Sequence, residues 1–267
     1  MKNFEMRKQK EIEHANKLKI LLENTPDQEK VAGNKKFYSI TRASQQYVNS
    51  QIIKTISPGK KFLDYCCGDG TMSIWMAHQG ADVCGIDISD VSIRIARQKV
   101  ARACLQRKPN FAVMDAERLS FDDNSFDVVF CGGVLHHLDI AVAYKELARV
   151  LKPGGRIICG EPLAYNPVFQ LYRRRTPQFR TEWEAEHILT KKMIFLAKDH
   201  FSAIDIRFFH LATLLAVPFR RTPIFNFVLG ICEAADALLL RIPLIKWLAW
   251  QTVFVLSCPK KNGKKIV

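Results

Sequence analysis

The stretch that most constrains this chain is residues 62–70, which read FLDYCCGDG. An apolar run ends at Asp64, passes through a turn of small residues, and leads into a helical pattern from Thr71. Glycine accepts positive φ at little cost and lets a ligand approach the backbone. Such a turn also aims backbone N–H groups and the positive end of the helix dipole at its ligand. The segment therefore predicts a strand, a nucleotide-binding turn and a helix N-terminus.

A second acidic residue, Asp87, follows in the position where a second strand would present a carboxylate to a ribose. The dinucleotide-binding pattern G-x-G-x-x-G needs a third glycine that allows close packing of the helix on the strand. This chain has Ser73 at that place, after Cys66, Gly68 and Gly70. The turn therefore favours a nucleotide-like ligand and departs from the dinucleotide pattern.

Three further segments extend this pattern. Residues 111–117 predict a third strand that ends in acidic residues, and residues 128–138 predict a buried strand that opens onto small residues and paired histidines. Residues 146–158 predict a helix, a Pro-Gly-Gly turn and another strand. The alternation of strands and helices over residues 62–161 indicates a parallel sheet with right-handed crossovers.

Taken together, these segments resemble the class I S-adenosylmethionine-dependent methyltransferases, most closely the ubiquinone/menaquinone-biosynthesis-like, methyltransferase type 11 branch. The resemblance covers about residues 55–161, and Cys66 departs from the family's first glycine. It implies an α/β fold with a Rossmann-like doubly wound sheet. That sheet should be mostly parallel, with helices on both faces and an antiparallel closing strand at residues 251–259.

The expected organisation is an N-terminal helical lid or cap, residues 1–56, before a methyltransferase domain, residues 57–267. Substrate-side insertions are expected at about residues 162–190 and 223–250. The second insertion is rich in apolar residues, but charges and a proline interrupt it, so no run is long enough for a membrane span. It predicts either a helical hairpin packed on the domain or an interfacial amphipathic element.

The resemblance implies S-adenosylmethionine as the cofactor and assigns roles by position. The backbone of residues 66–70 would meet the methionine half, Asp64 would approach the amino end, and Asp87 would bind the ribose hydroxyls. For each acidic residue the alternative is a cap or surface carboxylate. The implied cofactor-binding set is Asp64, Tyr65, Cys66, Cys67, Gly68, Gly70, Asp87, Ile88, Asp115, Ala116, Cys131 and Gly132.

S-adenosylmethionine carries its own activated methyl group, so the protein has to align donor and acceptor and exclude water. His136 or His137 could remove a proton from an oxygen or nitrogen nucleophile, since imidazole titrates near neutral pH. Tyr38 and Glu161 are further catalytic candidates, and each of the four could equally be structural. No metal site is expected, because the adjacent histidines have no matching ligand cluster.

The chain has 40 Lys and Arg against 26 Asp and Glu, a formal net charge of +14. This charge favours an anionic partner such as nucleic acid, anionic lipid or an acidic substrate. Eight cysteines without a Cys-x-x-Cys pair favour thiols in a reducing compartment. The first residues carry no apolar signal region. We therefore expect a cytoplasmic protein, with peripheral attachment to a membrane as an option.

The leading functional hypothesis is methyl transfer to an O, N or C nucleophile of a small, lipophilic molecule. Residues 223–250 motivate it, because they could line a substrate pocket or touch an anionic membrane. The net charge motivates an alternative, an RNA (tRNA or rRNA) methyltransferase, although no RNA-binding module is recognisable. A further alternative is a non-catalytic donor-binding partner subunit. The methyl acceptor and the oligomeric state stay open at this point.

Overall fold

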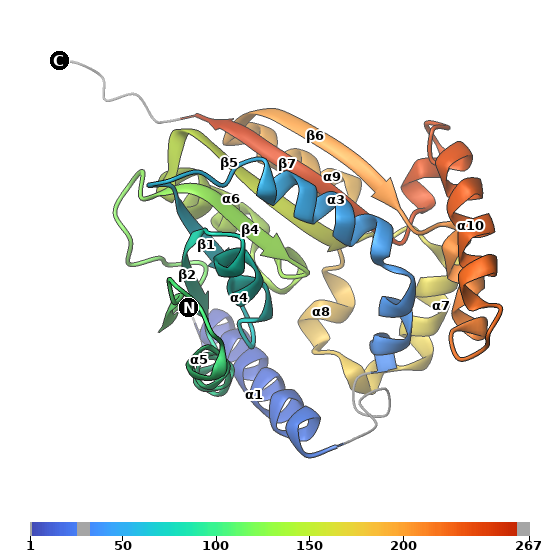
Figure 1. Cartoon of the computed structure of the whole chain (residues 1–267), viewed down its shortest axis with the longest axis horizontal. Helices are drawn as coiled ribbons and strands as arrows, with labels where there is room; N and C mark the ends of the chain where they lie inside the picture. Colours follow the sequence, from blue (N-terminus) through green and yellow to red (C-terminus); the bar gives the residue numbers. More distant parts are fainter. Residues whose placement is uncertain (1, 26–32, 261–267) are drawn as a thin grey trace. The chain divides into compact units, whose positions relative to one another are not determined.

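The computed structural model describes residues 2–25 and 33–260. Its strands are β1 (Lys61–Tyr65), β2 (Asp82–Asp87), β3 (Asn110–Val113), β4 (Phe126–Gly132), β5 (Leu151–Pro162), β6 (Phe201–Phe209) and β7 (Gln251–Pro259). They form one sheet in the order β3-β2-β1-β4-β5-β7-β6 (Figure 1). Strand β1 is parallel to β2 and to β4, and β2 is parallel to β3. The predicted Rossmann-like, doubly wound fold is confirmed.

The closing strand β7 runs antiparallel to β6. The Trp250 N–H, just before β7, donates to the carbonyl of His210, just after β6, over 3.0 Å. The Lys260 N–H, just after β7, donates to the carbonyl of His200, just before β6, over 2.7 Å. Because the start of one strand meets the end of the other, the two strands have opposite directions. This confirms the antiparallel closing strand that the sequence predicts.

Helix starts in the sheet region follow local sequence signals. Helix α5 begins after Ser89, whose hydroxyl accepts the Ser92 N–H over 2.9 Å. Helix α6 begins after Asp139, whose carboxylate accepts the Ala141 N–H over 3.1 Å. These side chains satisfy N–H groups that have no partner within the helix.

The helices of the described residues are α1 (Lys2–Asn24), α3 (Arg42–Ile53), α4 (Thr71–His78), α5 (Asp90–Arg102), α6 (Ile140–Val150), α7 (Pro167–Arg175), α8 (Glu182–Glu186), α9 (Lys191–Leu196) and α10 (Phe225–Leu239).

Short 3₁₀ helices complete the described chain: η1 (Gly33–Ile40), η2 (Leu135–His137), η3 (Pro177–Phe179), η4 (Ala197–Asp199), η5 (Ala212–Phe219) and η6 (Ile245–Leu248). Among the described residues, no helix has the length and apolar character needed to cross a membrane.

Two local expectations were wrong. The Pro-Gly-Gly sequence at residues 153–155 does not turn the chain, because β5 runs through it without a break. A Cβ on Gly155 would lie 2.8 Å from the Asp127 carbonyl oxygen, so the glycine permits close approach of the backbones. Residues 223–250 do not form a hairpin of two long helices either. They form the single helix α10, followed by the short η6.

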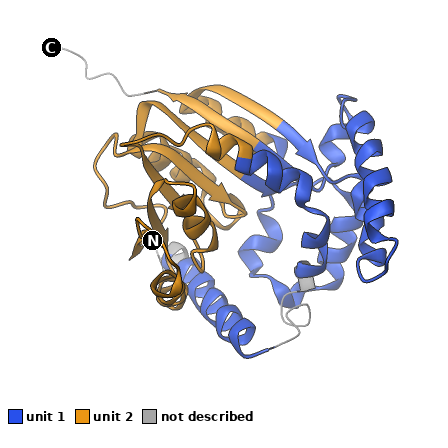
Figure 2. Cartoon of the chain, viewed as in Figure 1, with its two compact units in different colours: residues 1–49, 160–191, 207–253 blue, residues 50–159, 192–206, 254–267 orange. Residues whose placement is uncertain are grey.

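Two compact units divide the chain (Figure 2). Unit 1 comprises residues 1–49, 160–191 and 207–253, and unit 2 comprises residues 50–159, 192–206 and 254–267. Unit 2 therefore contains β1 to β4 with α4, α5 and α6, and α5 packs against β2 and β3. Unit 1 gathers three stretches that are far apart in the sequence, so its core can form only through long-range contacts.

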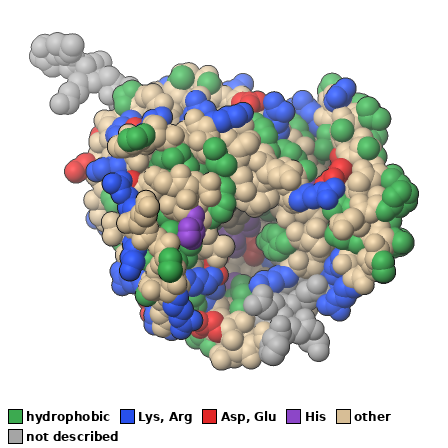
Figure 3. Space-filling view, in the orientation of Figure 1, with side chains coloured by type: hydrophobic (Ala, Val, Ile, Leu, Met, Phe, Trp, Pro, Cys, Tyr) green, Lys and Arg blue, Asp and Glu red, His purple; other side chains and the backbone are tan. Residues whose placement is uncertain are grey.

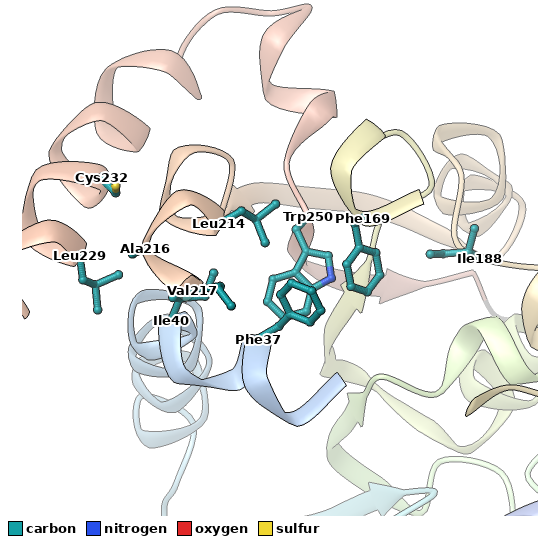
Figure 4. Packing of buried hydrophobic residues seen from close by; sticks show 10 residues of the cluster. All are labelled: Phe37, Ile40, Phe169, Ile188, Leu214, Ala216, Val217, Leu229, Cys232 and Trp250. Atoms are coloured by element: carbon teal, nitrogen blue, oxygen red, sulfur yellow. The ribbon is translucent and has the colours of Figure 1, made fainter. Parts of the chain in front are cut away.

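Aromatic rings form the core of unit 1 (Figure 4). The ring centroids of Phe37 and Phe169 lie 5.4 Å apart, and the Trp250 ring lies 5.6 Å from the first and 5.2 Å from the second. Such pairs stabilise a core beyond the area they bury. The cluster continues through η5 and α10 with Leu214, Ala216, Val217, Leu229 and Cys232.

Candidate active site

The carboxyl ends of four parallel strands bring the predicted cofactor residues to one edge of the sheet. Tyr65 at the end of β1 is in register with Ile86 of β2 and Cys131 of β4, and Asp87 is in register with Val113 of β3. The chain runs outward from β1 through β2 to β3 and then returns to β4 on the other side of β1. Ligands of open α/β sheets bind beyond the strand ends at such a reversal.

The turn after β1 alternates between left-handed and other backbone conformations. Cys66, Gly68 and Gly70 have φ angles of 59°, 53° and 73°. Runs of this kind turn successive N–H groups to one side and form concave sites for negatively charged groups. Helix α4 follows at once; its N-cap residue Gly70 has no side chain, and the Asp69 carboxylate accepts the Thr71 N–H over 3.4 Å. The N–H groups of Cys67, Gly68 and Gly70 already donate to acceptors of the protein, so the turn offers a carboxylate or phosphate mainly the positive end of the helix dipole.

Cys66 occupies a conformation that suits glycine, and this leads to a prediction. Left-handed backbone costs a residue with a Cβ about 1–2 kcal/mol. Cys66→Gly should raise the free energy of unfolding by about 0.5–1 kcal/mol, once the extra entropy of glycine in the unfolded chain is subtracted. Cys67, whose φ is not positive, provides the matched control. Cys67→Gly should lower the stability in the same chemical denaturation experiment, and equal effects of the two changes would contradict the prediction.

Asp64 is buried at the start of the turn, with 2% of its surface exposed. The Ser73 hydroxyl donates to its carboxylate over 2.5 Å. Burial raises the pKa of Asp64 to about 7, and the hydrogen bonds from Ser73 oppose that rise. Ser73 is the residue that stands in place of a third glycine. In the sequence it appears only as a missing glycine, and the structure adds its role as a hydrogen-bond partner of Asp64.

Asp87 joins the end of β2 to the turn. One carboxylate oxygen accepts the Gly68 N–H over 2.9 Å, and the other accepts the Ser89 N–H over 2.9 Å. A carboxylate has about four lone-pair sites, so both oxygens retain capacity for hydroxyl donors. Asp87 can therefore shape the turn and bind a diol at the same time. The sequence predicted the second role and missed the first.

The Phe111 ring of β3 supports the turn from within unit 2. A Cβ on Gly70 would lie 2.9 Å from this ring and 2.8 Å from the Ala96 side chain. A Cβ on Gly85 of β2 would lie 2.7 Å from the same ring. Both glycines thus make room for Phe111. At the surface of the turn, Lys99 pairs with Asp69 over 2.8 Å.

The predicted residues near the ends of β1, β2 and β4 divide into two groups. The side chains of Tyr65 and Cys131 are fully buried, so only their backbones can face a ligand. The Tyr65 hydroxyl donates to the Ala116 carbonyl over 2.7 Å. By contrast, Ile88 is half-buried and Gly132 is exposed.

Asp115 and Glu117 organise the loop after β3. Asp115 accepts the Glu117 N–H over 2.9 Å. Glu117, 5% exposed, accepts the Asp139 N–H at the start of α6 over 2.7 Å. Glu117 was not among the residues predicted to act in the site. Its signal in the sequence is a second acidic residue two positions after Asp115, at the predicted strand end.

The histidines expected to act as bases lie in η2, in the same unit as the residues above. Their ring centroids are 4.3 Å apart; His136 is buried and His137 is half-buried. Among the described residues, no three or more His, Cys, Asp or Glu side chains are grouped to hold a metal ion.

Tyr38 and Glu161 belong to unit 1. Glu161 is 1% exposed near the end of β5, whereas Tyr38 is 59% exposed and its ring centroid lies 6.4 Å from that of Trp250. The ordinary pKa of a tyrosine is about 10. Tyr38 therefore keeps its proton at neutral pH and is suited to donate a hydrogen bond rather than to act as a base.

Residues 63–159 match the family model of a methyltransferase domain. They form a class I S-adenosylmethionine-dependent methyltransferase domain. Over 110 residues this chain is 38% identical to a demethylmenaquinone methyltransferase of Staphylococcus aureus (strain MRSA252), a match that covers 40% of this chain and 44% of the relative. The chain therefore spans less than half the length of the curated relative that it matches.

Solved structures are similar over more of the chain. A SAM-dependent methyltransferase from Methanosarcina mazei has a TM-score of 0.54 and 25% identity, covering 78% of this chain and 97% of that one. Phosphoethanolamine N-methyltransferase 2 of Haemonchus contortus has a TM-score of 0.59 and 17% identity, covering 90% and 59%. At this identity the second similarity concerns the fold alone.

Proposed function

We propose that this protein transfers a methyl group from S-adenosylmethionine to an O, N or C nucleophile of a small, lipophilic acceptor. The observation that carries the proposal is the strand-end site, in which the Asp87 carboxylate accepts the Gly68 N–H of the left-handed turn and the Ser89 N–H at the carboxyl end of β2. The methyltransferase domain at residues 63–159 supports the same reaction.

The site residues fit this cofactor. The backbone of residues 66–70 would meet the methionine half, and the positive end of the α4 dipole would attract its carboxylate. Asp64 would face the cationic amino group, and Asp87 would accept the ribose hydroxyls. The loop of Asp115 and Ala116 would meet the adenine edge, with Ile88 against its face.

The bound cofactor supplies a methyl group that is already activated on a sulfonium. The protein has to hold the acceptor in line with that methyl group and exclude water. For an oxygen or nitrogen nucleophile, His136 or His137 would accept the proton that the acceptor loses. Tyr38 would orient the acceptor as a hydrogen-bond donor, and Glu161 would accept a hydrogen bond from it.

The raised pKa of Asp64 predicts a pH dependence of cofactor binding. The ionised carboxylate should bind the cationic amino group, whereas the protonated carboxyl should not. With a pKa of about 7, the ionised fraction rises about eightfold between about pH 6 and pH 7.5. Affinity measured by calorimetry should increase by a similar factor over this range. In Asp64→Asn the affinity should be lower and nearly constant, and a rise of about eightfold that persists in that variant would refute the assignment.

The aromatic cluster of unit 1 motivates a lipophilic acceptor. Tyr38 is largely exposed, and its ring lies 6.4 Å from that of the buried Trp250, which packs in the core with Phe37 and Phe169. Rings of this kind bind flat or hydrocarbon-rich molecules. A cytoplasmic enzyme in peripheral contact with a membrane through residues 223–250 would have access to lipophilic molecules in that membrane.

Two measurements test the proposed function. Titration calorimetry should give saturable, equimolar binding of S-adenosylmethionine. Absence of binding would refute the proposed function. Mass spectrometry of lipid extracts incubated with enzyme and donor should reveal a molecule that gains one methyl group. Binding of tRNA that falls steeply with salt, together with methylated RNA, would instead favour the RNA alternative.

A further inference from the structure

Helix α10 of unit 1 is apolar on its outward side as well as on its inward side. Leu229 and Cys232 are buried towards η5, against which the helix packs. Phe227, Ile231 and Leu238 are 73%, 57% and 66% exposed. With the exposed Ala234 they recur at helical spacing, so they form one stripe. In Figure 3, hydrophobic side chains gather over the position that α10 has in Figure 1.

The stripe continues into the segments at both ends of α10. Ile224 precedes the helix and is 52% exposed; Ile242 and Leu244 follow it and are 44% and 85% exposed. Leu215 of the neighbouring η5 is 68% exposed. A soluble protein rarely leaves so many large apolar side chains together in water unless they bind something. We call the residues Leu215, Ile224, Phe227, Ile231, Leu238, Ile242 and Leu244 the apolar face.

Charge around the apolar face is basic. Both acidic residues of α10 are engaged within unit 1: Glu233 pairs with Arg42 over 2.7 Å, and Asp236 is buried and accepts the Thr213 hydroxyl over 3.0 Å. The segments at the ends of the helix carry the basic residues Arg220, Arg221, Arg241 and Lys246. A surface with apolar side chains between basic groups complements an anionic lipid bilayer.

The length of helix α10 determines whether it could span a bilayer or would lie in the plane of its interface. Helix α10 has 15 residues and is about 22 Å long at 1.5 Å per residue, less than the roughly 30 Å of a hydrocarbon core. We infer that the apolar face docks the protein on an anionic membrane, with α10 lying in the plane of the interface. The inference rests on the proposed function for its purpose, delivery of a lipophilic acceptor, but its test needs no methyl transfer.

The test is cosedimentation of the full chain with vesicles of phosphatidylcholine and phosphatidylglycerol. Wild type should bind these vesicles, should bind pure phosphatidylcholine more weakly, and should release from the anionic vesicles as salt is raised. The triple variant Phe227→Ser, Ile231→Ser, Leu238→Ser should lose at least about tenfold in partition coefficient. The double variant Ile20→Ser, Leu21→Ser removes two exposed apolar residues from α1, which are 45% and 43% exposed, and should bind as wild type does.

A second variant tests the charges without touching the apolar stripe. Replacing Arg221, Arg241 and Lys246 by glutamine should remove most of the preference for phosphatidylglycerol. Binding of S-adenosylmethionine should be unchanged in every variant, which separates this inference from the proposed function. Wild-type binding that is indifferent to lipid charge would overturn the inference, as would a triple variant that binds normally. A dimer in lipid-free solution that the triple variant dissociates would assign the face to a second copy of the chain instead.

Discussion

Asp87→Ala should weaken S-adenosylmethionine binding by about 100-fold or more. Two hydrogen bonds from ribose hydroxyls to a carboxylate contribute about 1.5 kcal/mol each, and about 3 kcal/mol corresponds to more than a hundredfold in affinity. The same change leaves the Gly68 and Ser89 N–H groups without the carboxylate that they now contact. The turn that holds the methionine half would therefore also lose a support. Calorimetric titration of both proteins measures the effect.

Two variants show whether the loss is specific. Asp69→Ala removes a carboxylate from the same turn, but this one pairs with Lys99 at the surface, and surface pairs contribute at most about 1 kcal/mol. It should bind the cofactor almost as wild type does. Asp87→Asn places an NH₂ group where one N–H or hydroxyl donor now points, so its affinity should fall between the other two. Equal affinity of Asp87→Ala and Asp69→Ala would show that Asp87 does not bind the ribose.

The sequence was sufficient to predict the sheet and the residues at its carboxyl edge. Apolar runs followed by Asp64 and Asp87 indicate where parallel strands end, and parallel strands end at the same edge. What the sequence could not indicate was which way each side chain points. Tyr65 and Cys131 were expected near the cofactor, yet both side chains are buried in the core.

The partners of Asp64 and the packing of the turn depend on contacts distant in sequence. Phe111 fills the space that Gly70 and Gly85 leave open, and no local pattern links these three positions. The same reason explains why unit 1 was harder to predict than the sheet. Its core joins η1, α7 and the start of β7, which approach one another only in the folded chain.

A buried polar network in unit 1 should make stability depend on pH. His210 is 1% exposed, and its two ring nitrogens contact the Ser44 hydroxyl over 2.8 Å and the Thr213 hydroxyl over 3.2 Å. The Thr213 hydroxyl donates its hydrogen to Asp236 over 3.0 Å. It must therefore accept from Nδ1–H of His210. The single hydrogen of the Ser44 hydroxyl has three acceptors within reach: Nε2 of His210, the Thr41 carbonyl and Gln251 Oε1, the last two over 3.0 Å each.

Burial lowers the pKa of His210 from 6.5 to about 4. Above pH 6.5 the folded and unfolded states are both neutral at this residue. Between about pH 6.5 and pH 4 only the unfolded state binds the proton, so acid favours unfolding. At pH 4 the lost stability should approach about 3 kcal/mol. Asp64 has the opposite effect on stability. Because its pKa is raised in the folded state, that state binds a proton between about pH 7 and pH 4, so acid favours folding at this residue.

The contributions of His210 and Asp64 to the unfolding free energy change with pH in opposite directions. The pH profile of wild-type stability would therefore reveal neither, and variants of each residue are needed. His210→Gln should be less stable than wild type at about pH 7, and the gap in unfolding free energy should shrink by about 3 kcal/mol towards pH 4. Asp64→Asn should show the opposite trend, with wild type gaining on the variant as pH falls. Urea denaturation across this pH range measures both gaps. A gap for His210→Gln that is constant with pH would mean that the folded protein takes up the proton as readily as the unfolded chain does.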